Sequence, residues 1–424
     1  MLSFSLIASQ ILGPVFFPIF ERAFYVLSVT GIYWLPPLLL STFLTFWLSY
    51  IRAYYKASVE WALLEIKLPR EINKSPRAME IVFSPFYVTR DGTWPKRWFT
   101  GLVRAWFSLE IVSIDGHVHF FIRTPRFFVN LIEAHIYSQY SEVQIIEVDD
   151  YTQYVDFGKE RSEWDIFGTE FKFSKPDPYP IKTYIDYELD KELKEDKKHI
   201  DPLTAVIEYL GSLKQGEQFW LQILIQAAKK RFPDPEARWK WWKKRSWKDE
   251  GLDLVKKLMK RDARPLPGED YVDFSKQILS PGERRVVESI ERGISKLGFD
   301  CGIRALYLAK KDVYTQINHV ATIGLLRPFN AEDMNTFKDN EKKRTDFDYP
   351  WQDFKGLRLN YKKRTIFNAY RLRSFFYPPY QRTPVTLSVE ELATLYHFPG
   401  AVLETPTFIR IPSKTGEPPS NLPT

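Results

Sequence analysis

The first part of the chain is apolar and almost free of charge. Only Glu21 and Arg22 are charged before position 52, so 29 uncharged residues separate Arg22 from Arg52. A helix needs about 20 apolar residues to cross the hydrocarbon core of a bilayer. This pattern predicts a membrane anchor at residues 1–56 with a transmembrane helix at residues 32–51.

Prolines interrupt this apolar segment. Pro36 and Pro37 are expected to disturb the first turns of the span, because proline has no backbone N–H. Residues 1–20 contain two more prolines, and the sequence leaves open whether they lie in the interface, re-enter or form a second span. A cleaved signal peptide is disfavoured, because no basic segment precedes the apolar run and the main run is long. Aromatic residues typical of the membrane interface occur at Trp34, Trp47, Tyr50, Tyr54 and Tyr55.

The chain after the anchor alternates between strand-like and helix-like patterns. A first strand at 61–68 is followed by a predicted helix start at Ser75-Pro76, where a capping residue precedes proline. Strands at 107–114 and 118–124 flank Asp115-Gly116, a dipeptide that favours a tight hairpin turn. A second helix start at Thr124-Pro125 and a strand at 143–148 complete the order strand, helix, hairpin, helix, strand. This order predicts a ferredoxin-like unit at residues 57–155.

A second round of similar elements follows. Asp201-Pro202 and Ser280-Pro281 predict two helices, at 202–210 and 281–296, and Glu283 would complete a capping box in the second. Predicted strands lie at 181–187, 218–226 and 302–309, and an insertion at 228–279 contains a short strand at 271–274. The predicted fold class is therefore α+β, with a transmembrane helix, two tandem ferredoxin-like units, the second at 165–330, and an irregular C-terminal tail. The alternative is one irregular α+β domain.

The last hundred residues have less pattern. Residues 315–326 have the apolar spacing of an amphipathic helix. Residues 331–424 are expected to be basic and irregular, apart from a short helix capped by Ser388 and Glu391. The segment ends in the proline-rich PSKTGEPPSNLPT, which has the composition of a linker.

Composition excludes some classes of protein. Hydrophobic residues make up 44% of the 424 residues and aromatic residues 16%, which is too much apolar material for a disordered chain. The single cysteine, Cys301, excludes an intrachain disulfide framework.

The net charge of +7 is unevenly distributed. Residues 229–261 contain 13 basic and 5 acidic residues, and residues 338–373 contain 11 and 5, so these two segments hold +8 and +6. In the first, tryptophans alternate with lysines, which suits anionic lipid headgroups, unpaired nucleic-acid bases, or packing within the protein. The sequence leaves these three interpretations open. The candidate contact residues are Arg238, Trp239, Lys240, Trp241, Trp242, Lys243, Lys244, Arg245 and Trp247.

Basic residues also indicate how the chain lies in a membrane. Arg52, Lys56, Lys67 and Arg70 follow the predicted span, whereas Arg22 is the only basic residue before it. An excess of Lys and Arg marks the cytoplasmic side of a span. The sequence therefore predicts a single-pass protein of the cell inner membrane with its large C-terminal region in the cytoplasm.

Known catalytic signatures are missing from the sequence. It contains no GxxxxGK[ST], GxGxxG, HExxH or GxSxG motif. His117, His119 and His135 could converge on a metal ion, but a polar residue after a hairpin turn is ordinary. Cys301 begins a buried strand and is expected to be a small core residue. The pairs Asp149-Asp150 and Glu390-Glu391 are adjacent and therefore point apart, so no catalytic residue, metal ligand or cofactor is predicted.

Five stretches have a recognisable character: SLEIVSIDGHVHFFIRTPRFFVNLIEAHIYSQYSEVQIIEVDDYT at 108–152, GTEFKFSKPDPYPIKTY at 168–184, DPLTAVIEYLGSLKQGEQFWLQILIQ at 201–226, VEELATLYHFPG at 389–400 and EPPSNLP at 417–423. Together they resemble the N-terminal, non-ATPase region of membrane-anchored conjugative-transfer or type IV secretion-like ATPases of the HerA/FtsK superfamily. In such proteins this region precedes a P-loop ATPase core, and the EPPSNLP-like stretch resembles the approach to it. The resemblance implies a membrane-tethered platform without the ATPase core, and it supplies no active-site residues.

These observations lead to three functional hypotheses. The first is a non-enzymatic membrane scaffold or accessory subunit of a DNA-translocation or type IV secretion-like apparatus, which docks a P-loop ATPase encoded separately. The second is a membrane-bound nucleic-acid-binding protein that uses the basic tryptophan-rich insertion. The third is a membrane enzyme with an unrecognised site. The expected partners are the lipid bilayer and that ATPase, and the sequence leaves DNA binding and homo-oligomerisation open.

Overall fold

The computed structural model describes residues 2–69, 72, 74–158, 162–190, 201–233, 244–259, 279–347 and 349–400. The chain divides into two compact units. The first unit contains residues 1–58 and 91–103, and the second contains residues 59–90 and 104–424.

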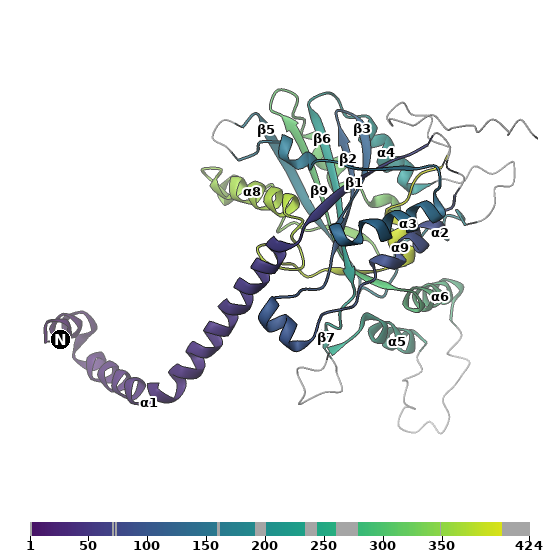
Figure 1. Ribbon diagram of the computed structural model, residues 1–424. Coiled ribbons are helices and arrows are strands. Elements are labelled where there is room, and N and C mark those ends of the chain that lie inside the picture. The colour runs from purple at the N-terminus through teal and green to yellow at the C-terminus, as the bar shows by residue number, and fades with distance from the viewer. Residues whose placement is uncertain are drawn as a thin grey trace, which may run out of the picture. The chain divides into compact units, whose positions relative to one another are not determined.

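The first unit is dominated by one long helix, α1 (Leu2–Ser58) (Figure 1). Its part from Ser28 to Ser58 is long and apolar enough to cross a membrane. Hydroxyl groups here bond to the preceding helical turn: Thr42 Oγ1, for example, donates to the Leu38 carbonyl at 2.7 Å. Such bonds satisfy polar groups where water is absent. The predicted apolar helix near the N-terminus is confirmed.

The second unit is built on one antiparallel sheet. Its described strands follow the order β10-β5-β9-β6-β2-β3-β1-β4, and β11 also pairs with β9. Every pair in this sheet is antiparallel. The strands are β1 (Trp61–Lys67), β2 (Phe107–Ile114), β3 (His117–Pro125), β4 (Gln144–Glu147), β5 (Trp164–Phe173), β6 (Glu217–Ala227), β9 (Gly298–Lys310), β10 (Phe337–Asp339) and β11 (Val385–Ser388).

Two local features determine how these strands meet. Asp115 and Gly116 have φ angles of 53° and 84°, so the hairpin between β2 and β3 has the positive φ values predicted from Asp-Gly. On its other side β2 pairs with β6, and the register runs from Phe107 opposite Ile225 to Ile114 opposite Gln218. This pairing joins strands from both predicted halves of the chain into a single sheet.

Most of the helices of the second unit cover one face of the sheet (Figure 1). Their buried apolar residues form a large core with alternate residues of the strands. The N-terminus of one helix is capped as predicted, because the Asp201 side chain accepts a hydrogen bond from the Leu203 N–H at 2.8 Å. The helices of this face are α2 (Arg77–Val82), α3 (Val129–Gln139), α4 (Pro202–Gly211), α7 (Ile317–Gly324) and α9 (Val389–Leu395).

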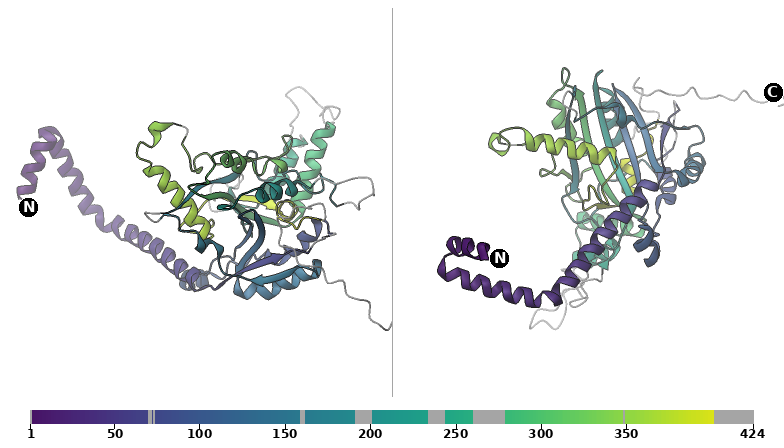
Figure 2. Two further views of the ribbon diagram at one scale, coloured as in Figure 1. Left: turned by 90° about the horizontal axis from the view of Figure 1, so that it is seen from above. Right: turned by 60° about the vertical axis from the view of Figure 1, so that its left-hand side comes forward.

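The opposite face is covered by α8 (Leu357–Arg371) and by the 3-10 turn η4 (Tyr151–Tyr154). Figure 2 shows α8, in yellow-green, on the other side of the sheet from α2 and α3. Ile366, Phe367 and Tyr370 of α8 pack on a smaller apolar core.

A third core lies between α5 (Trp247–Leu258) and α6 (Pro281–Ser295). Both helices begin with a capping box, formed by Ser246 with Asp249 and by the predicted pair Ser280 with Glu283. The remaining elements are η1 (Ser84–Phe86), the π-helical turn η2 (Lys96–Thr100), η3 (Arg126–Phe128), η6 (Arg327–Phe329), η7 (Pro350–Gln352) and the separate pair β7 (Phe232–Pro233) and β8 (Lys244–Arg245).

Several predicted elements differ from the structure. Residues 181–187 form no strand: they are irregular up to Thr183 and then form turns, and the N–H groups of Ile181 and Tyr184 donate to side chains of α9. Thr124-Pro125 belongs to the end of β3, and the helix starts only at Val129. The short strand predicted at 271–274 lies outside the described residues.

Two further differences concern helices. The C-terminal region was expected to be irregular, yet it contains the 15-residue helix α8, which buries Ile366, Phe367 and Tyr370 on one side. In α1 the helix also continues through Pro36 and Pro37. The predicted α+β class is confirmed.

A buried ion pair fastens the end of α8 to the sheet. Arg373 Nε donates to Glu110 Oε1 on β2 at 2.9 Å, and its Nη2 donates to Oε2 at 3.1 Å. The same guanidinium binds Asp150, and Tyr151 donates to Glu110 at 2.7 Å. Arg373 adopts the left-handed conformation, with φ 46°, which places its side chain beneath the helix end.

The charges in this network stabilise one another. Burial raises the pKa of Glu110, but attraction and hydrogen bonds from Arg373 outweigh it and hold that pKa below its usual range. Both side chains are inaccessible to solvent. Removing one partner of such a pair leaves a buried charge unpaired, which lowers the free energy of unfolding strongly. Replacing the whole pair by apolar residues changes the free energy of unfolding much less.

We expect Arg373→Met to lower the free energy of unfolding by about 3 to 5 kcal/mol, because Glu110 and Asp150 would lose their cation. The exposed neighbour Arg371→Met is the matched control and should change stability little. Thermal and urea unfolding of the full chain in mild detergent measures both. Equal stabilities of the two variants would show that the network does not hold α8.

Candidate functional site

The outer side of α8 and the segment before it form an exposed aromatic and basic surface. The helix buries one side against the sheet, so residues spaced by three and four positions share the opposite side. We call this the α8 surface, and it consists of Tyr349, Trp351, Phe354, Lys355, Leu357, Arg358, Tyr361, Arg364 and Arg371.

The apolar members of the α8 surface are unusually accessible. Phe354 is 86% exposed, Tyr361 73% and Leu357 67%. The rings of Tyr349 and Trp351 stack with centroids 4.6 Å apart, and both remain more than half exposed. A cluster of large exposed apolar side chains marks an interaction surface more often than a free face of a monomer.

Hydrogen bonds hold the segment before α8 in place. Asp353 accepts from the Leu359 N–H at 2.7 Å, at the start of the helix, and Arg358 donates to the Gln352 carbonyl at 3.2 Å. Gly356 adopts a φ of 67°, a conformation that favours glycine. The exposed aromatic residues are therefore presented by an ordered turn and helix.

The basic residues of the α8 surface lie beside these aromatic residues. Lys355, Arg358, Arg364 and Arg371 are exposed. The nearby carboxylate of Asp353 already caps the helix. The arrangement suits a partner that offers both apolar and negatively charged groups.

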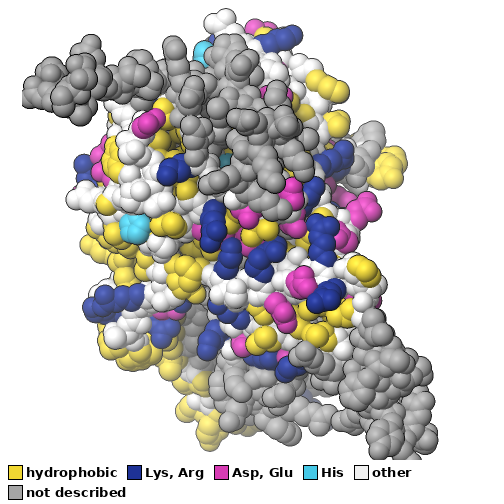
Figure 3. All heavy atoms as spheres, turned by 90° about the vertical axis from the view of Figure 1, so that its right-hand side faces the viewer, with side chains coloured by type: hydrophobic (Ala, Val, Ile, Leu, Met, Phe, Trp, Pro, Cys, Tyr) yellow, Lys and Arg dark blue, Asp and Glu magenta, His cyan; other side chains and the backbone are white. Residues whose placement is uncertain are grey.

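Charged side chains elsewhere on the second unit form ion pairs. Figure 3 shows a face on which Lys and Arg side chains lie beside Asp and Glu side chains. Examples are Arg285, on α6, with Asp186 at 3.2 Å and Lys296, which directly follows α6, with Glu80 at 2.7 Å. The α8 surface differs in its aromatic content and in its excess of positive charge.

The predicted contact residues of the insertion are only partly described. Arg238, Trp239, Lys240, Trp241, Trp242 and Lys243 lie outside the described residues. Lys244 is exposed, whereas Arg245 forms an ion pair with Asp253 at 2.6 Å. Trp247 is buried between α5 and α6, and its indole occupies the space where a side chain at Gly298 would lie. Trp247 therefore packs within the protein and is not available to stack on a base.

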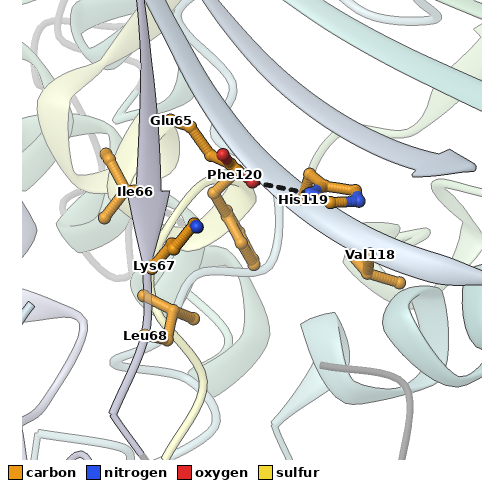
Figure 4. Close-up of a pocket in the computed structure, with 7 residues that line it drawn as sticks. All are labelled: Glu65, Ile66, Lys67, Leu68, Val118, His119 and Phe120. Carbon is orange, nitrogen blue, oxygen red and sulfur yellow. Dashed lines mark hydrogen bonds and ion pairs between the residues drawn. The ribbon is translucent and has the colours of Figure 1, made fainter. Parts of the chain in front are cut away.

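The three histidines do not meet. His119 Nδ1 lies 2.7 Å from Glu65 Oε1 across β3 and β1, and Figure 4 shows these two side chains pointing toward each other. The hydrogen bond from His119 lowers the pKa of Glu65. The adjoining cavity has a volume of only about 20 Å³. Across the part of the chain that the structure describes, no three His, Cys, Asp or Glu side chains are grouped as metal ligands would be.

The cysteine and the adjacent acidic pairs that the sequence offered as candidates have structural roles. Cys301 is buried on β9, and burial raises the pKa of its thiol well above the usual range, which confirms it as a core residue. Asp150 binds Arg373, as described above. Glu391 caps α9 and accepts from the Ile181 N–H at 3.0 Å, and burial raises its pKa to about 7. Glu390 pairs with Arg292 at 3.2 Å.

A larger cavity of about 370 Å³ opens beside β5, β10 and β11. Two of its charged groups, Asp177 and Lys175, have partners within the protein. Asp177 binds Arg231 at 2.5 Å and accepts from the Thr386 N–H at 3.0 Å, while Lys175 Nζ donates to the carbonyls of Glu332 and Asp333. These contacts join neighbouring segments of the protein, whereas Glu170 Oε1 and Arg382 Nε are buried at the cavity without a hydrogen-bond partner among the described residues.

Sequence analysis missed a buried ion pair at the start of α4. His397 Nε2 lies 2.9 Å from Asp201 Oδ2, and His397 Nδ1 lies 3.1 Å from the Ala393 carbonyl. Both ring nitrogens face acceptors, an arrangement that favours the protonated form of the ring. Burial lowers the pKa of His397, but the attraction of Asp201 and these hydrogen bonds outweigh it and raise that pKa.

Neither a family model nor a curated protein matches this chain.

The His397–Asp201 pair predicts a specific dependence of stability on pH. Because the folded pKa of His397 is raised, its contribution is complete below the unfolded value of about 6.5 and is lost as the pH rises through the folded pKa. The pKa of Asp201 is lowered, although burial opposes this, so its contribution is lost as the pH falls through that lowered value.

We expect the melting temperature of the wild type to fall more between pH 6 and pH 9 than that of His397→Gln, whose amide can donate but does not titrate. Thermal unfolding in detergent measures this difference. His135→Gln, on α3, serves as the control and should follow the wild type. Parallel pH profiles for His397→Gln and the wild type would contradict the ion pair.

Proposed function

We propose that this protein is a non-enzymatic scaffold or accessory subunit, anchored in the inner membrane, of a DNA-translocation or type IV secretion-like apparatus. The observation that supports this most is chain continuity. The apolar helix α1 ends at Ser58, and β1, which pairs with both β3 and β4, starts at Trp61. A membrane anchor would therefore lead directly into an inner strand of the sheet.

The surroundings of the charged groups support a non-catalytic role. Glu110, Asp150, Asp201 and Glu391 form ion pairs or cap helices, and the sequence has no phosphate-binding loop. Energy for translocation would then come from a separate P-loop ATPase, as the resemblance to the non-ATPase region of such motors suggests. The excess of basic residues after the span favours a cytoplasmic position for the sheet unit, where such an ATPase works.

We also propose that residues 57–155 are a ferredoxin-like module and that residues 165–330 are a second, related module. Support for the first comes from the strand order β4-β1-β3-β2, with α2 between β1 and β2 and α3 between β3 and β4. In the second, α4 and α6 alternate with β5, β6 and β9. Residues 228–279 would be an insertion in it, and residues 331–424 would follow it.

The α8 surface is the proposed docking site for the ATPase. It presents large aromatic residues, which contribute most to protein interfaces, within a rim of basic residues. A partner with an acidic and apolar patch would complement it.

We expect a P-loop ATPase to copurify with the full chain from native membranes in mild detergent. Leu357→Ser combined with Tyr361→Ser should reduce its recovery by about tenfold or more, because large apolar anchors at an interface contribute about 1 to 2 kcal/mol each. Quantitative mass spectrometry of the purified complex measures this.

Tyr154→Ser is the matched control, since Tyr154 is 74% exposed and Tyr361 is 73% exposed. All variants should melt within a few degrees of the wild type. Recovery of the chain without any ATPase, or an equal recovery from the double variant and the control, would contradict this function.

Nucleic-acid binding is the second candidate, and the stacked, exposed rings of Tyr349 and Trp351 favour it. Aromatic faces beside basic side chains suit single-stranded nucleic acid, because bases stack on the rings and phosphates pair with the cations. The basic insertion would extend such a surface.

If this second function holds, binding of single-stranded DNA should weaken steeply with salt. Arg358→Glu with Arg364→Glu should lower the slope of log K against log salt by about 0.7 for each lost phosphate contact. Lys240→Glu, Lys243→Glu and Lys244→Glu together test the insertion, while Arg284→Glu on α6 is the control. Fluorescence anisotropy at several salt concentrations measures the slopes, and an absence of binding at low salt would exclude this function.

A further inference from the structure

Residues Asp91–Val103 interrupt the sheet unit but belong to the compact unit of α1. They follow α2 and η1 in the chain and precede β2. The segment contains the π-helical turn η2, and we call it the 91–103 segment. The inference below rests on the proposed role of α1 as a membrane span.

Specific contacts hold the 91–103 segment against α1. Trp47 Nε1 donates to the Trp98 carbonyl at 2.9 Å. Gly101 has a φ of 69°, and a Cβ there would overlap the carbonyl of Ile51. A larger residue at this position would therefore push the segment away from the helix.

The segment exposes both apolar and basic side chains. Trp94 is 59% exposed and Phe99 is 64% exposed, and their ring centroids lie 6.4 Å apart. Lys96 and Arg97, between them in the chain, are also exposed. A short turn with two exposed aromatic rings and two cations is costly to leave in water, because the rings keep apolar area hydrated.

The neighbouring part of α1 indicates which environment would cover these rings. Trp47 lies in the apolar stretch, and the side chains around it point outward: Phe46 is 71% exposed and Tyr50 is 65% exposed. Arg52 and Lys56 follow within the next two helical turns. Aromatic residues followed by cations are the composition of a span at the membrane–water interface.

We propose that the 91–103 segment is a second membrane contact, which lies in the headgroup region at the C-terminal end of the span. Trp94 and Phe99 enter the boundary between headgroups and acyl chains, where amphipathic segments are buried by about 5 to 10 Å. Lys96 and Arg97 face anionic headgroups, which attract basic residues near the surface. Because Trp47 and Ile51 bind this segment, they lie at the same depth, and the segment determines where α1 leaves the bilayer.

A site-specific fluorescent label can test this depth in the full chain. Cysteines replace Phe99, Phe43 within the span, or Tyr154 on the sheet unit, and each is labelled with an environment-sensitive dye. Cys301 is buried, so the parent chain should remain unlabelled and serves as a control. The labelled chains are placed in nanodiscs of phosphatidylcholine with phosphatidylglycerol that contain doxyl quenchers near the headgroup or deep in the acyl chains.

We expect shallow quenchers to act at least about twofold more strongly on the label at 99 than on the label at 154, because position 99 lies within the interface. Deep quenchers should act most strongly on the label at 43. Quenching at 43 without quenching at 99 would overturn this inference and leave the span intact. That result would indicate that a protein partner, and not lipid, covers Trp94 and Phe99. A label at 43 that no lipid quencher reaches would instead overturn the proposed membrane anchor.

A charge variant separates anionic lipid from the bilayer in general. Lys96→Glu with Arg97→Glu, in the chain labelled at 99, should reduce shallow quenching in nanodiscs that contain phosphatidylglycerol and change it little in phosphatidylcholine alone. Arg126→Glu, on the sheet unit, is the matched control. If the double variant is quenched as strongly as its parent in both membranes, the electrostatic part of the proposal is wrong.

Discussion

The ion pair of Arg373 with Glu110 holds the C-terminal part of the chain on the centre of the sheet. Glu110 lies on β2, the strand that pairs with β3 on one side and β6 on the other. Two charges removed from water are costly, and only several good hydrogen bonds can offset that cost. Here Glu110 receives them from Arg373, Ser108, Tyr151 and Gln222. The position of α8, and with it the exposure of its outer side, depends on this contact.

An apolar helix alone could not cover this face of the sheet, because the face contains buried polar residues that need hydrogen-bond partners. Glu110, Gln222, Arg304 and Glu170 stand opposite one another on β2, β6, β9 and β5, so a row of buried polar residues crosses the sheet. The segment after α8 covers this row and supplies polar partners, such as the Ser374 carbonyl, which accepts from Arg304 at 2.7 Å. The face that holds α8 therefore requires a covering segment with matching polar groups, while the opposite face is covered by apolar side chains.

Local signals in the sequence correctly predicted much of the fold. Capping residues before proline marked α4 and α6, Asp115-Gly116 marked the hairpin, and strand-like apolar runs marked the central strands, because each of these depends on the chemistry of a few neighbouring residues. Ile181 and Tyr184 misled the prediction, since both are buried but their N–H groups donate to side chains of α9, two hundred residues later, and not to a neighbouring strand. The α8 surface was missed for a related reason. The sequence of α8 is basic and aromatic and does not by itself indicate a helix, because the burial of one side of α8 depends on the sheet.

The sequence by itself determined the apolar anchor, the α+β class and the uneven charge, because length, spacing and composition are properties of the chain. Only the tertiary structure decided which charged residues are exposed. Trp247 and Arg373 both occur in basic segments, yet one is buried against α6 and the other beneath α8. It also assigned residues 91–103 to the unit of α1. Burial and pairing join residues that are far apart in the chain, so no local pattern contains them.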